Sequence, residues 1–208
     1  MVPTESLLKD LQKRGFHRLS IWSRGVDHEL FHPCDEVLEV LCDLPRPIFL
    51  HVGRVAVEKN IKAFLGLDLP GSKVVVGGGP QLEDLKRNYP DVHFTGAKFG
   101  EELAAHYAAG DVFVFPSLTD TFGNVVLEVL ASGVPVAAFP VTGSLDILGG
   151  TGAGVLDEDL GQAALKALGI DRTRCGEVAL EYTLAKAARQ FLDNILEAKG
   201  VAERKAAE

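Results

Sequence analysis

The chain has 208 residues, of which 47% are hydrophobic and 24% charged, so it is long enough and apolar enough to bury a sizeable core. Its formal net charge is −8 with acids and bases interspersed, which argues against nucleic acid as a partner because phosphate neutralisation needs a concentrated basic surface. The start lacks the apolar core of a signal peptide, and no apolar run approaches the roughly 20 residues that span a bilayer. Three scattered cysteines frame neither a disulfide fold nor a metal site. We therefore expect a cytoplasmic protein without a transmembrane segment.

The first 45 residues are expected to be less regular than the rest. The pattern predicts a short helix over residues 5–14 and a strand over residues 19–22, followed by an irregular connection, RGVDHELFHP.

From residue 46 onwards, short apolar runs alternate with stretches of helical spacing. The runs are almost continuously hydrophobic, which is typical of strands buried on both faces of a parallel sheet. The predicted strands are 48–53, 73–78, 92–96, 112–116 and 135–139, and the predicted helices are 57–66, 80–88, 101–109, 123–132 and 144–148. This alternation predicts βαβ units and therefore a doubly wound, Rossmann-like α/β fold.

Beyond Gly154 the pattern changes. A short strand-like run, GVLD, precedes extra helices near residues 159–168, 173–181 and 183–199. The charged, alanine-rich tail over residues 200–208 is expected to be frayed or disordered.

The loops that follow the predicted strands carry the unusual residues. Ligands of open α/β sheets bind at the carboxyl ends of the strands. The segment GRVAVEKN brings Gly53, Arg54 and Lys59 to that edge, and GGGP brings a glycine turn over residues 77–80. PSLTDTFGNVVLE leads into a helix that carries Glu128. Three strand ends thus bring cations, glycines and carboxylates to one edge.

An anion site is predicted where the helix after the fourth strand begins, near Phe122, Gly123 and Asn124. Its first backbone amides and the positive end of its dipole attract a phosphate, and Gly123 permits close approach. Arg54 and Lys59 can neutralise a diphosphate there. The alternative is that both cations are solvated loop residues.

Two acids flank this helix start. Asp120 precedes it, and Glu128 lies roughly 12 Å further along at about 1.5 Å per helical residue. This spacing suits an extended sugar-diphosphate-nucleoside, with Asp120 at the sugar and Glu128 at the ribose. The alternative makes Asp120 a helix cap and Glu128 a surface residue. Glu128, however, lies among apolar neighbours and needs a polar partner.

Other polar residues are assigned to the scaffold. Asp157 and Asp159 form a D-x-D pattern, which we attribute to helix capping rather than to metal binding. His51 lies close to the ligand edge of the sheet, where one alternative is that it lines the pocket, but we expect it to be packed and hydrogen-bonded. His93 and His106 are expected to support the fold. The GGGP turn does not complete the pattern G-x-G-x-x-G, so a nicotinamide-dependent dehydrogenase is rejected.

Four segments, GRVAVEKN, GGGP, VHFTG and PSLTDTFGNVVLEVLASGVPVAAFPVTG, together resemble the retaining glycosyltransferases of GT-B architecture (glycosyl transferases group 1), which include many mannosyl- and glucosyltransferases. The resemblance runs from RGVDHELFHP to ARQFLDNIL. It implies the carboxyl-terminal, donor-binding lobe of a two-lobed enzyme. Residues 1–45 would hold the interlobe connection and the first strand, and residues 46–199 the nucleotide-sugar-binding domain with its C-terminal helices. The implied partner is an N-terminal acceptor-binding lobe.

The resemblance also implies residue roles. Arg54, Lys59 and Asp120 would be catalytic, the two cations holding the donor diphosphate and Asp120 touching the transferred sugar. The family has glutamate where this chain has Asp120, which shortens the reach by one methylene. The donor-binding residues would be Gly53, Gly78, Ala97, Lys98, Phe122, Gly123, Asn124 and Glu128. Ala97 and Lys98 would lie near the nucleobase and Glu128 at the ribose. The family generally acts without a metal, so no metal or cofactor is expected.

Three functions remain open at this stage. The first is sugar transfer with retention from GDP-mannose or a UDP-hexose to an acceptor, the full-length form lying in the cytoplasm or peripherally at the inner membrane. The second is a non-catalytic sugar-nucleotide-binding module or an inactive fragment. The third is an epimerase or phosphorylase of the same architecture.

Overall fold

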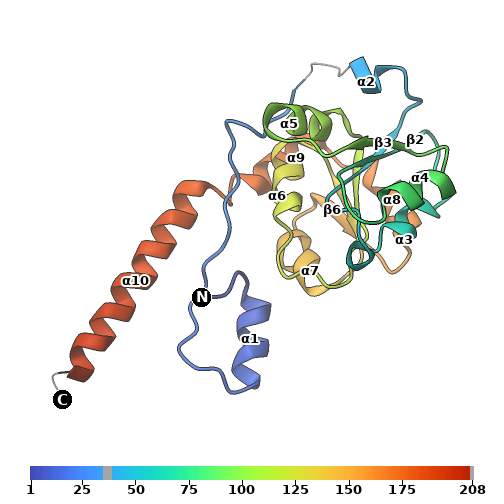
Figure 1. Ribbon diagram of the computed structural model, residues 1–208. Coiled ribbons are helices and arrows are strands. Elements are labelled where there is room, and N and C mark those ends of the chain that lie inside the picture. Colours follow the sequence, from blue (N-terminus) through green and yellow to red (C-terminus); the bar gives the residue numbers. More distant parts are fainter. Residues whose placement is uncertain (35–38, 207–208) are drawn as a thin grey trace.

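A single parallel sheet of six strands forms the centre of the protein in this computed structural model, which describes residues 1–34 and 39–206 (Figure 1). The strands are β1 (Ile48–Val52), β2 (Ser72–Val76), β3 (His93–Gly96), β4 (Val112–Phe115), β5 (Val136–Ala138) and β6 (Gly154–Leu156). They lie in the order β3-β2-β1-β4-β5-β6, and every neighbouring pair is parallel. The five predicted strands are confirmed, and the GVLD run supplies the sixth.

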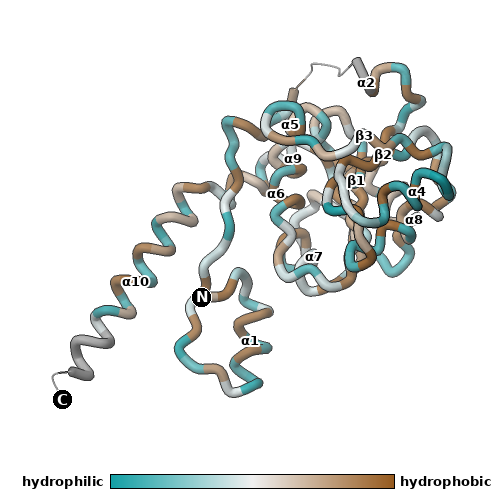
Figure 2. Tube along the Cα trace, viewed as in Figure 1, coloured by the Kyte–Doolittle hydropathy of each residue, from teal (hydrophilic) through white to brown (hydrophobic). Residues whose placement is uncertain are grey.

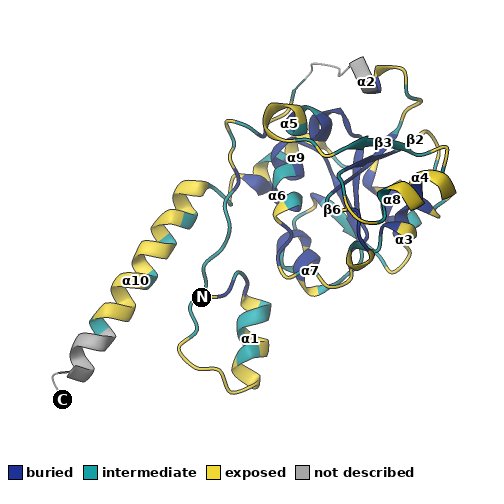
Figure 3. Ribbon diagram, viewed as in Figure 1, coloured by how far each residue is buried: buried dark blue, intermediate teal, exposed yellow. Residues whose placement is uncertain are grey.

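The strands are hydrophobic (Figure 2), and helices cover both faces of the sheet, so the central strands β1, β4 and β5 are buried, whereas the edge strands β3 and β6 are half-buried (Figure 3). Alternate residues of one strand enter different cores. Ile48 and Leu50 of β1 enter one core, whereas Phe49 enters the other. This burial on both faces explains why the strands read as continuous apolar runs rather than as alternating patterns.

The helices divide between the two cores. One face packs against α5 (Gly100–Ala109), α6 (Asn124–Ala131), α7 (Thr142–Leu148) and α9 (Arg172–Ala179). The other packs against α3 (Ile61–Leu65), α4 (Leu82–Asn88) and α8 (Leu160–Ala167). The doubly wound fold predicted from the sequence is therefore confirmed.

Two predicted elements differ from the structure. Residues 19–22 form no strand of the sheet; Ile21 makes an isolated parallel bridge with Val2, so the first strand of the sheet is β1. The predicted helix over 57–66 is divided into a 3₁₀ turn, η1 (Val57–Lys59), and α3. Asn60 interrupts it with a left-handed backbone (φ 51°). The Asn60 side-chain amide donates to the carbonyl of Pro116 (3.0 Å), which favours the break over a continuous helix.

The N-terminal segment and the final helix lie to one side of the sheet, and the final helix projects away from it (Figure 1). Helix α1 (Glu5–Lys13) is followed by an extended segment, and a short α2 (Glu39–Cys42) precedes β1. The final helix, α10 (Leu184–Ala206), contacts the extended segment that follows α1. The Trp22 indole in this segment donates to the carbonyl of Ala187 (3.1 Å) and packs against Phe191 (centroids 4.9 Å apart). Helix α10 continues to Ala206, so residues 200–206 of the charged tail form the end of this helix; residues 207–208 lie outside the described residues.

Within the described part of the chain, no helix has the length and apolar character needed to cross a membrane.

Candidate functional site

The order of the strands reverses between β1 and β4. The chain runs outward from β1 to β2 and β3, then returns to place β4 on the other side of β1. The loops after β1 and β4 therefore diverge from adjacent strands, which is where open α/β sheets form ligand crevices. The hydrogen bond from Asn60 to Pro116 ties these two loops together.

An ion pair joins the two loops at this point. The ammonium of Lys59, at the end of η1, lies 2.6 Å from Oδ2 of Asp120. The Lys59 and Asp120 side chains are 31% and 19% exposed, so the pair is partly shielded from water and interacts more strongly than a fully solvated pair. An ammonium carries three donors, and the bond to Asp120 uses one of them. The pair can therefore hold a carboxylate and an anionic ligand together.

Asp120 does not cap the following helix, so that alternative was wrong. Helix α6 begins at Asn124, and its N-cap is Gly123 (φ 79°), which provides no side-chain hydrogen bond. The first amides of a helix lack intrahelical acceptors, so this start can receive a phosphate oxygen. Phe122 is buried and packs edge-on against Tyr182 (6.2 Å). Asn124 is exposed.

Gly143, at the start of α7, is a supporting residue that the sequence analysis missed. A Cβ atom at this position would lie 2.5 Å from the carbonyl oxygen of Asp120. Only glycine therefore lets α7 approach the Asp120 loop this closely. The signal was the single glycine of PVTGSLD, which closes the last of the four segments that carry the resemblance.

Arg54 is not brought to the Lys59–Asp120 pair. Its side chain is 66% exposed, and its guanidinium pairs with Glu58 at 3.2 Å. The structure thus places Lys59 against Asp120 at the crevice, whereas Arg54 lies at the entrance to a neighbouring cavity.

That cavity, of about 210 Å³, lies between the loops after β1, β2 and β3. We call it the glycine pocket; its lining consists of Val52, Gly53, Arg54, Val76, Gly77, Gly78, Ala97, Lys98, Phe99 and Leu103. The loops approach closely because a Cβ at Gly77 would lie 1.9 Å from the carbonyl oxygen of Gly53. Lys98 pairs with Glu102 beside the pocket. Five of the predicted site residues therefore share one cavity.

A larger cavity, of about 570 Å³, lies on the other side of Asp120. We call it the hydroxyl pocket because serine and threonine side chains recur in its wall. Its lining consists of Ser6, Leu7, Asp10, Leu118, Thr119, Asp120, Thr121, Pro140, Val141, Thr142 and Leu145. Hydroxyls and carboxylates with a few apolar side chains can bind a polyhydroxylated ring.

Glu128 lines neither cavity and has a protein partner that the sequence did not reveal. The buried hydroxyl of Tyr107, on α5, donates to Oε2 of Glu128 at 2.8 Å. Burial raises the pKa of the Glu128 carboxyl, and the hydrogen bond from Tyr107 opposes that rise. The expectation that this acid needs a polar partner was right. At least one of its partners is the tyrosine hydroxyl rather than a ligand.

Asp159 and His51, two of the residues assigned to the scaffold, make the hydrogen bonds expected of them. Asp159 caps α8 by accepting from the amide of Gln162 (3.0 Å). His51 is buried with Nδ1 3.1 Å from the carbonyl of Val114, and burial lowers its pKa to about 4. The described residues contain no cluster of three or more potential metal ligands among His, Cys, Asp and Glu.

Comparison with known proteins identifies the family to which the chain belongs. Residues 46–169 match the family described as "Glycosyl transferases group 1". The chain is 38% identical over 161 residues to the sulfoquinovosyl transferase SQD2 of Arabidopsis thaliana, covering 71% of this chain and 32% of that protein. It is 39% identical over 153 residues to a GDP-mannose-dependent alpha-mannosyltransferase of Mycobacterium tuberculosis (strain CDC 1551 / Oshkosh), covering 71% and 40%.

Among solved structures, Anabaena HepE in complex with UDP superposes with a TM-score of 0.77 at 15% identity, covering 94% of this chain and 63% of that one. Because the family match spans more than half of the chain, the protein belongs to the group 1 glycosyltransferases. The resemblance seen in the sequence is confirmed, as is the Rossmann-like fold of a GT-B lobe. The chain spans less than two thirds of the length of each of these three proteins.

Proposed function

We propose that this chain binds a nucleotide-diphosphate sugar at the carboxyl edge of its sheet and supplies the donor-binding half of a retaining glycosyltransferase. The observation that carries the proposal is the Lys59–Asp120 pair, which lies where the strand order reverses and beside the free start of α6. A cation, a carboxylate and unpaired backbone amides at one point suit a phosphorylated sugar.

Each part of the donor then has its own place. The diphosphate lies against Lys59 and the amides that follow Gly123, with Arg54 approaching from the entrance of the glycine pocket. The base enters that pocket, the ribose hydroxyls donate to Glu128, and the transferred sugar meets Asp120 at the hydroxyl pocket. These assignments are supported by the lining of the two cavities, and by the position of Asp120 before the start of α6 and of Glu128 within that helix.

The reaction breaks the bond between the anomeric carbon and the diphosphate oxygen, forms a bond from that carbon to an acceptor hydroxyl oxygen, and transfers the hydroxyl proton to the departing diphosphate. Negative charge develops on the departing diphosphate. Lys59 is held in place by Asp120 before the reaction, so it can stabilise that charge without reorganising. In this proposal the ammonium and the helix start perform the role, and no metal or cofactor is required.

The donor that we propose is GDP-mannose or a UDP-hexose. The Mycobacterium tuberculosis relative is named for its dependence on GDP-mannose, and HepE was solved with UDP.

The acceptor is proposed to bind a separate lobe that docks on the exposed side of α10. This helix is mostly exposed (Figure 3), yet hydrophobic residues recur along it (Figure 2). They are Leu184, Phe191, Leu192, Ile195 and Leu196, and Leu196 is 66% exposed. Apolar side chains so placed favour coverage by another surface.

Thermal unfolding with GDP-mannose, UDP-glucose, UDP-GlcNAc and ADP-glucose tests donor binding. A ligand that binds only the native state at 100 times its Kd stabilises it by about 2.7 kcal/mol, which for a chain of this size raises Tm by roughly 5–10 °C. We expect a GDP- or UDP-sugar to give such a rise and free hexose or inorganic phosphate to give little. Unchanged melting with all four donors at millimolar concentration would refute the proposal.

A binding module without catalysis is the second candidate, since each residue assigned above is given a contact with the donor and none a contact with the acceptor. Both candidates predict the thermal shift. They differ in turnover: a binding module neither transfers nor hydrolyses the sugar when a lone acceptor-binding lobe is added.

A further inference from the structure

Tyr107 has an unusual environment for a residue in the core. Its side chain is fully buried, and its ring packs edge-on against Phe31 (5.8 Å) and Phe113 (6.2 Å). Its one polar atom is the hydroxyl, which donates to Oε2 of Glu128 at 2.8 Å. A phenylalanine would fill the same apolar space, so the hydroxyl serves the contact with α6.

Glu128 depends on this contact for its polar support. No Lys, Arg or His of the described chain lies within ion-pair distance of it, and its Oε1 accepts no hydrogen bond from a described residue. On α9, which also packs against α6, the charged groups are engaged elsewhere: Arg172 donates to carbonyls at the end of α5, and Arg174 pairs with Glu177. Tyr107 is thus the group that orients and polarises this carboxylate.

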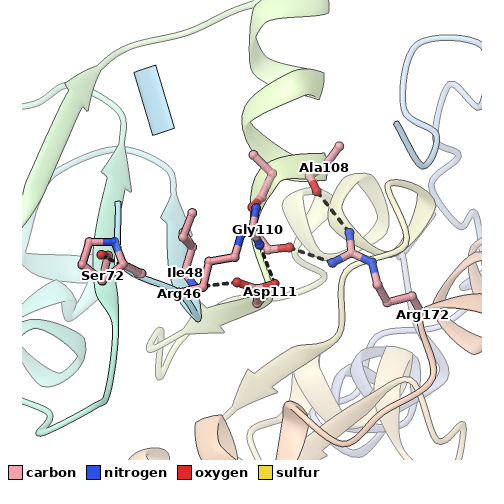
Figure 4. Close-up of polar contacts among 9 residues, drawn as sticks. Arg46, Ile48, Ser72, Ala108, Gly110, Asp111 and Arg172 are labelled. Carbon is pink, nitrogen blue, oxygen red and sulfur yellow. Dashed lines mark hydrogen bonds and ion pairs between the residues drawn. The ribbon is translucent and has the colours of Figure 1, made fainter. Parts of the chain in front are cut away.

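The end of α5 that carries Tyr107 is itself held firmly, as Figure 4 shows. The last carbonyls of a helix lack intrahelical donors. Here Arg172 donates to the carbonyls of Ala108 (3.1 Å) and Gly110 (2.9 Å), and Arg46 donates to that of Ala109 (3.3 Å) and pairs with Asp111 (2.6 Å). Two arginines from distant parts of the chain therefore fix the turn from which Tyr107 extends.

We propose that Tyr107 is a positioning residue for nucleoside recognition: its hydroxyl holds one oxygen of Glu128, so that the other is free and oriented to accept the ribose hydroxyls. This inference rests on the proposed function of Glu128 at the ribose. Under this inference Tyr107 supports the contact between Glu128 and the nucleoside but not the contact between Lys59 and the diphosphate, so the two contacts can be tested separately. A carboxylate fixed in one rotamer before binding loses less entropy when the ligand arrives.

The test is calorimetric titration of the 208-residue chain and its Tyr107→Phe variant with UDP, GDP and pyrophosphate. We expect the variant to bind its preferred nucleoside diphosphate about 3- to 10-fold more weakly, the range for one hydrogen bond to a charged group acting indirectly. Pyrophosphate affinity should change by less than about 2-fold. The matched control is Tyr89→Phe, which removes a hydroxyl for which the described contacts show no hydrogen bond, and it should leave all three affinities unchanged.

A double-mutant cycle distinguishes the possible failures. If Glu128→Ala weakens nucleoside diphosphate binding and adding Tyr107→Phe costs nothing more, Tyr107 acts through Glu128. If Tyr107→Phe has no effect on its own, or weakens binding equally in the Glu128→Ala background, the inference is overturned while the ribose contact stands. If Glu128→Ala itself has no effect, the proposed ribose contact of Glu128 is refuted, and the inference on Tyr107 is refuted with it.

Should Tyr107→Phe not fold, 3-fluorotyrosine incorporated at position 107 alone provides the second test. Fluorination makes the phenol a stronger donor while keeping the ring in place, so it stabilises the carboxylate of Glu128. The loss of nucleoside diphosphate affinity at acidic pH should then move to lower pH. If the affinity is lost at the same pH as in the unmodified protein, the inference is overturned.

Discussion

Lys59→Ala should weaken binding of both nucleoside diphosphate and pyrophosphate at least about 10-fold, because a charge-assisted hydrogen bond to phosphate contributes roughly 1.5–3 kcal/mol. If the chain is assembled with its acceptor lobe, transfer should fall by roughly 10²–10³, the cost of removing a donor aimed at developing charge. The measurement is calorimetric titration with GDP, UDP and pyrophosphate, followed by turnover with the preferred donor.

Two variants control the Lys59 experiment. Lys62→Ala removes an exposed lysine three residues further along, on α3, and should leave the affinities unchanged. Asp120→Ala keeps the ammonium but removes its carboxylate partner, so pyrophosphate affinity should not fall whereas sugar transfer should. Pyrophosphate binding that survives Lys59→Ala undiminished would show that the diphosphate lies elsewhere.

Glu128→Ala should separate the two halves of the ligand. Nucleoside diphosphate affinity is expected to fall about 10- to 100-fold, since hydrogen bonds from ribose hydroxyls to a carboxylate contribute roughly 1.5–3 kcal/mol. Pyrophosphate affinity should hardly change, because Glu128 lies beyond the start of α6 and touches no phosphate in the proposed complex. Glu101→Ala, at an exposed site on α5, is the matched control. Equal losses for GDP, UDP and pyrophosphate would show that the ribose contact is misassigned.

Glu128 also predicts a pH dependence whose sign can be derived. Ribose hydroxyls donate to the ionised carboxylate, so the affinity for nucleoside diphosphate falls as pH is lowered and Glu128 becomes protonated. Burial raises the Glu128 pKa, and this loss therefore begins at higher pH than for a solvated glutamate. The Glu128→Gln variant lacks the titrating group and should lose this component of the pH profile while keeping an acceptor for Tyr107.

The sheet could be predicted because its central strands β1, β4 and β5 are buried on both faces, which gives each of them an uninterrupted apolar run. The edge on which the site lies followed from the same reasoning, since parallel strands all end on one side. Breaks within a predicted helix could not be derived from the sequence in the same way. Asn60 breaks the predicted helix because its amide reaches the carbonyl of Pro116, a contact between segments 56 residues apart in the chain.

The contacts within the site were only partly visible in the sequence. Lys59 and Asp120 could be placed on the same edge, but their pairing across 61 residues depends on how two loops fold over adjacent strands. Arg54, expected beside Lys59, instead pairs with Glu58, its neighbour four residues on. Tyr107 resembled an ordinary core aromatic, because nothing in its local sequence indicates that its hydroxyl meets a carboxylate on another helix.

Amide chemical-shift mapping of the isotope-labelled chain during titration with GDP and UDP tests the central claim most directly. We expect the largest changes at Gly53, Gly78, Ala97, Gly123 and Asn124, at the carboxyl edge of the sheet, with none around Arg46 and Arg172 at the opposite edge. Changes confined to that opposite edge, or absent from both edges at millimolar nucleotide, would contradict the account.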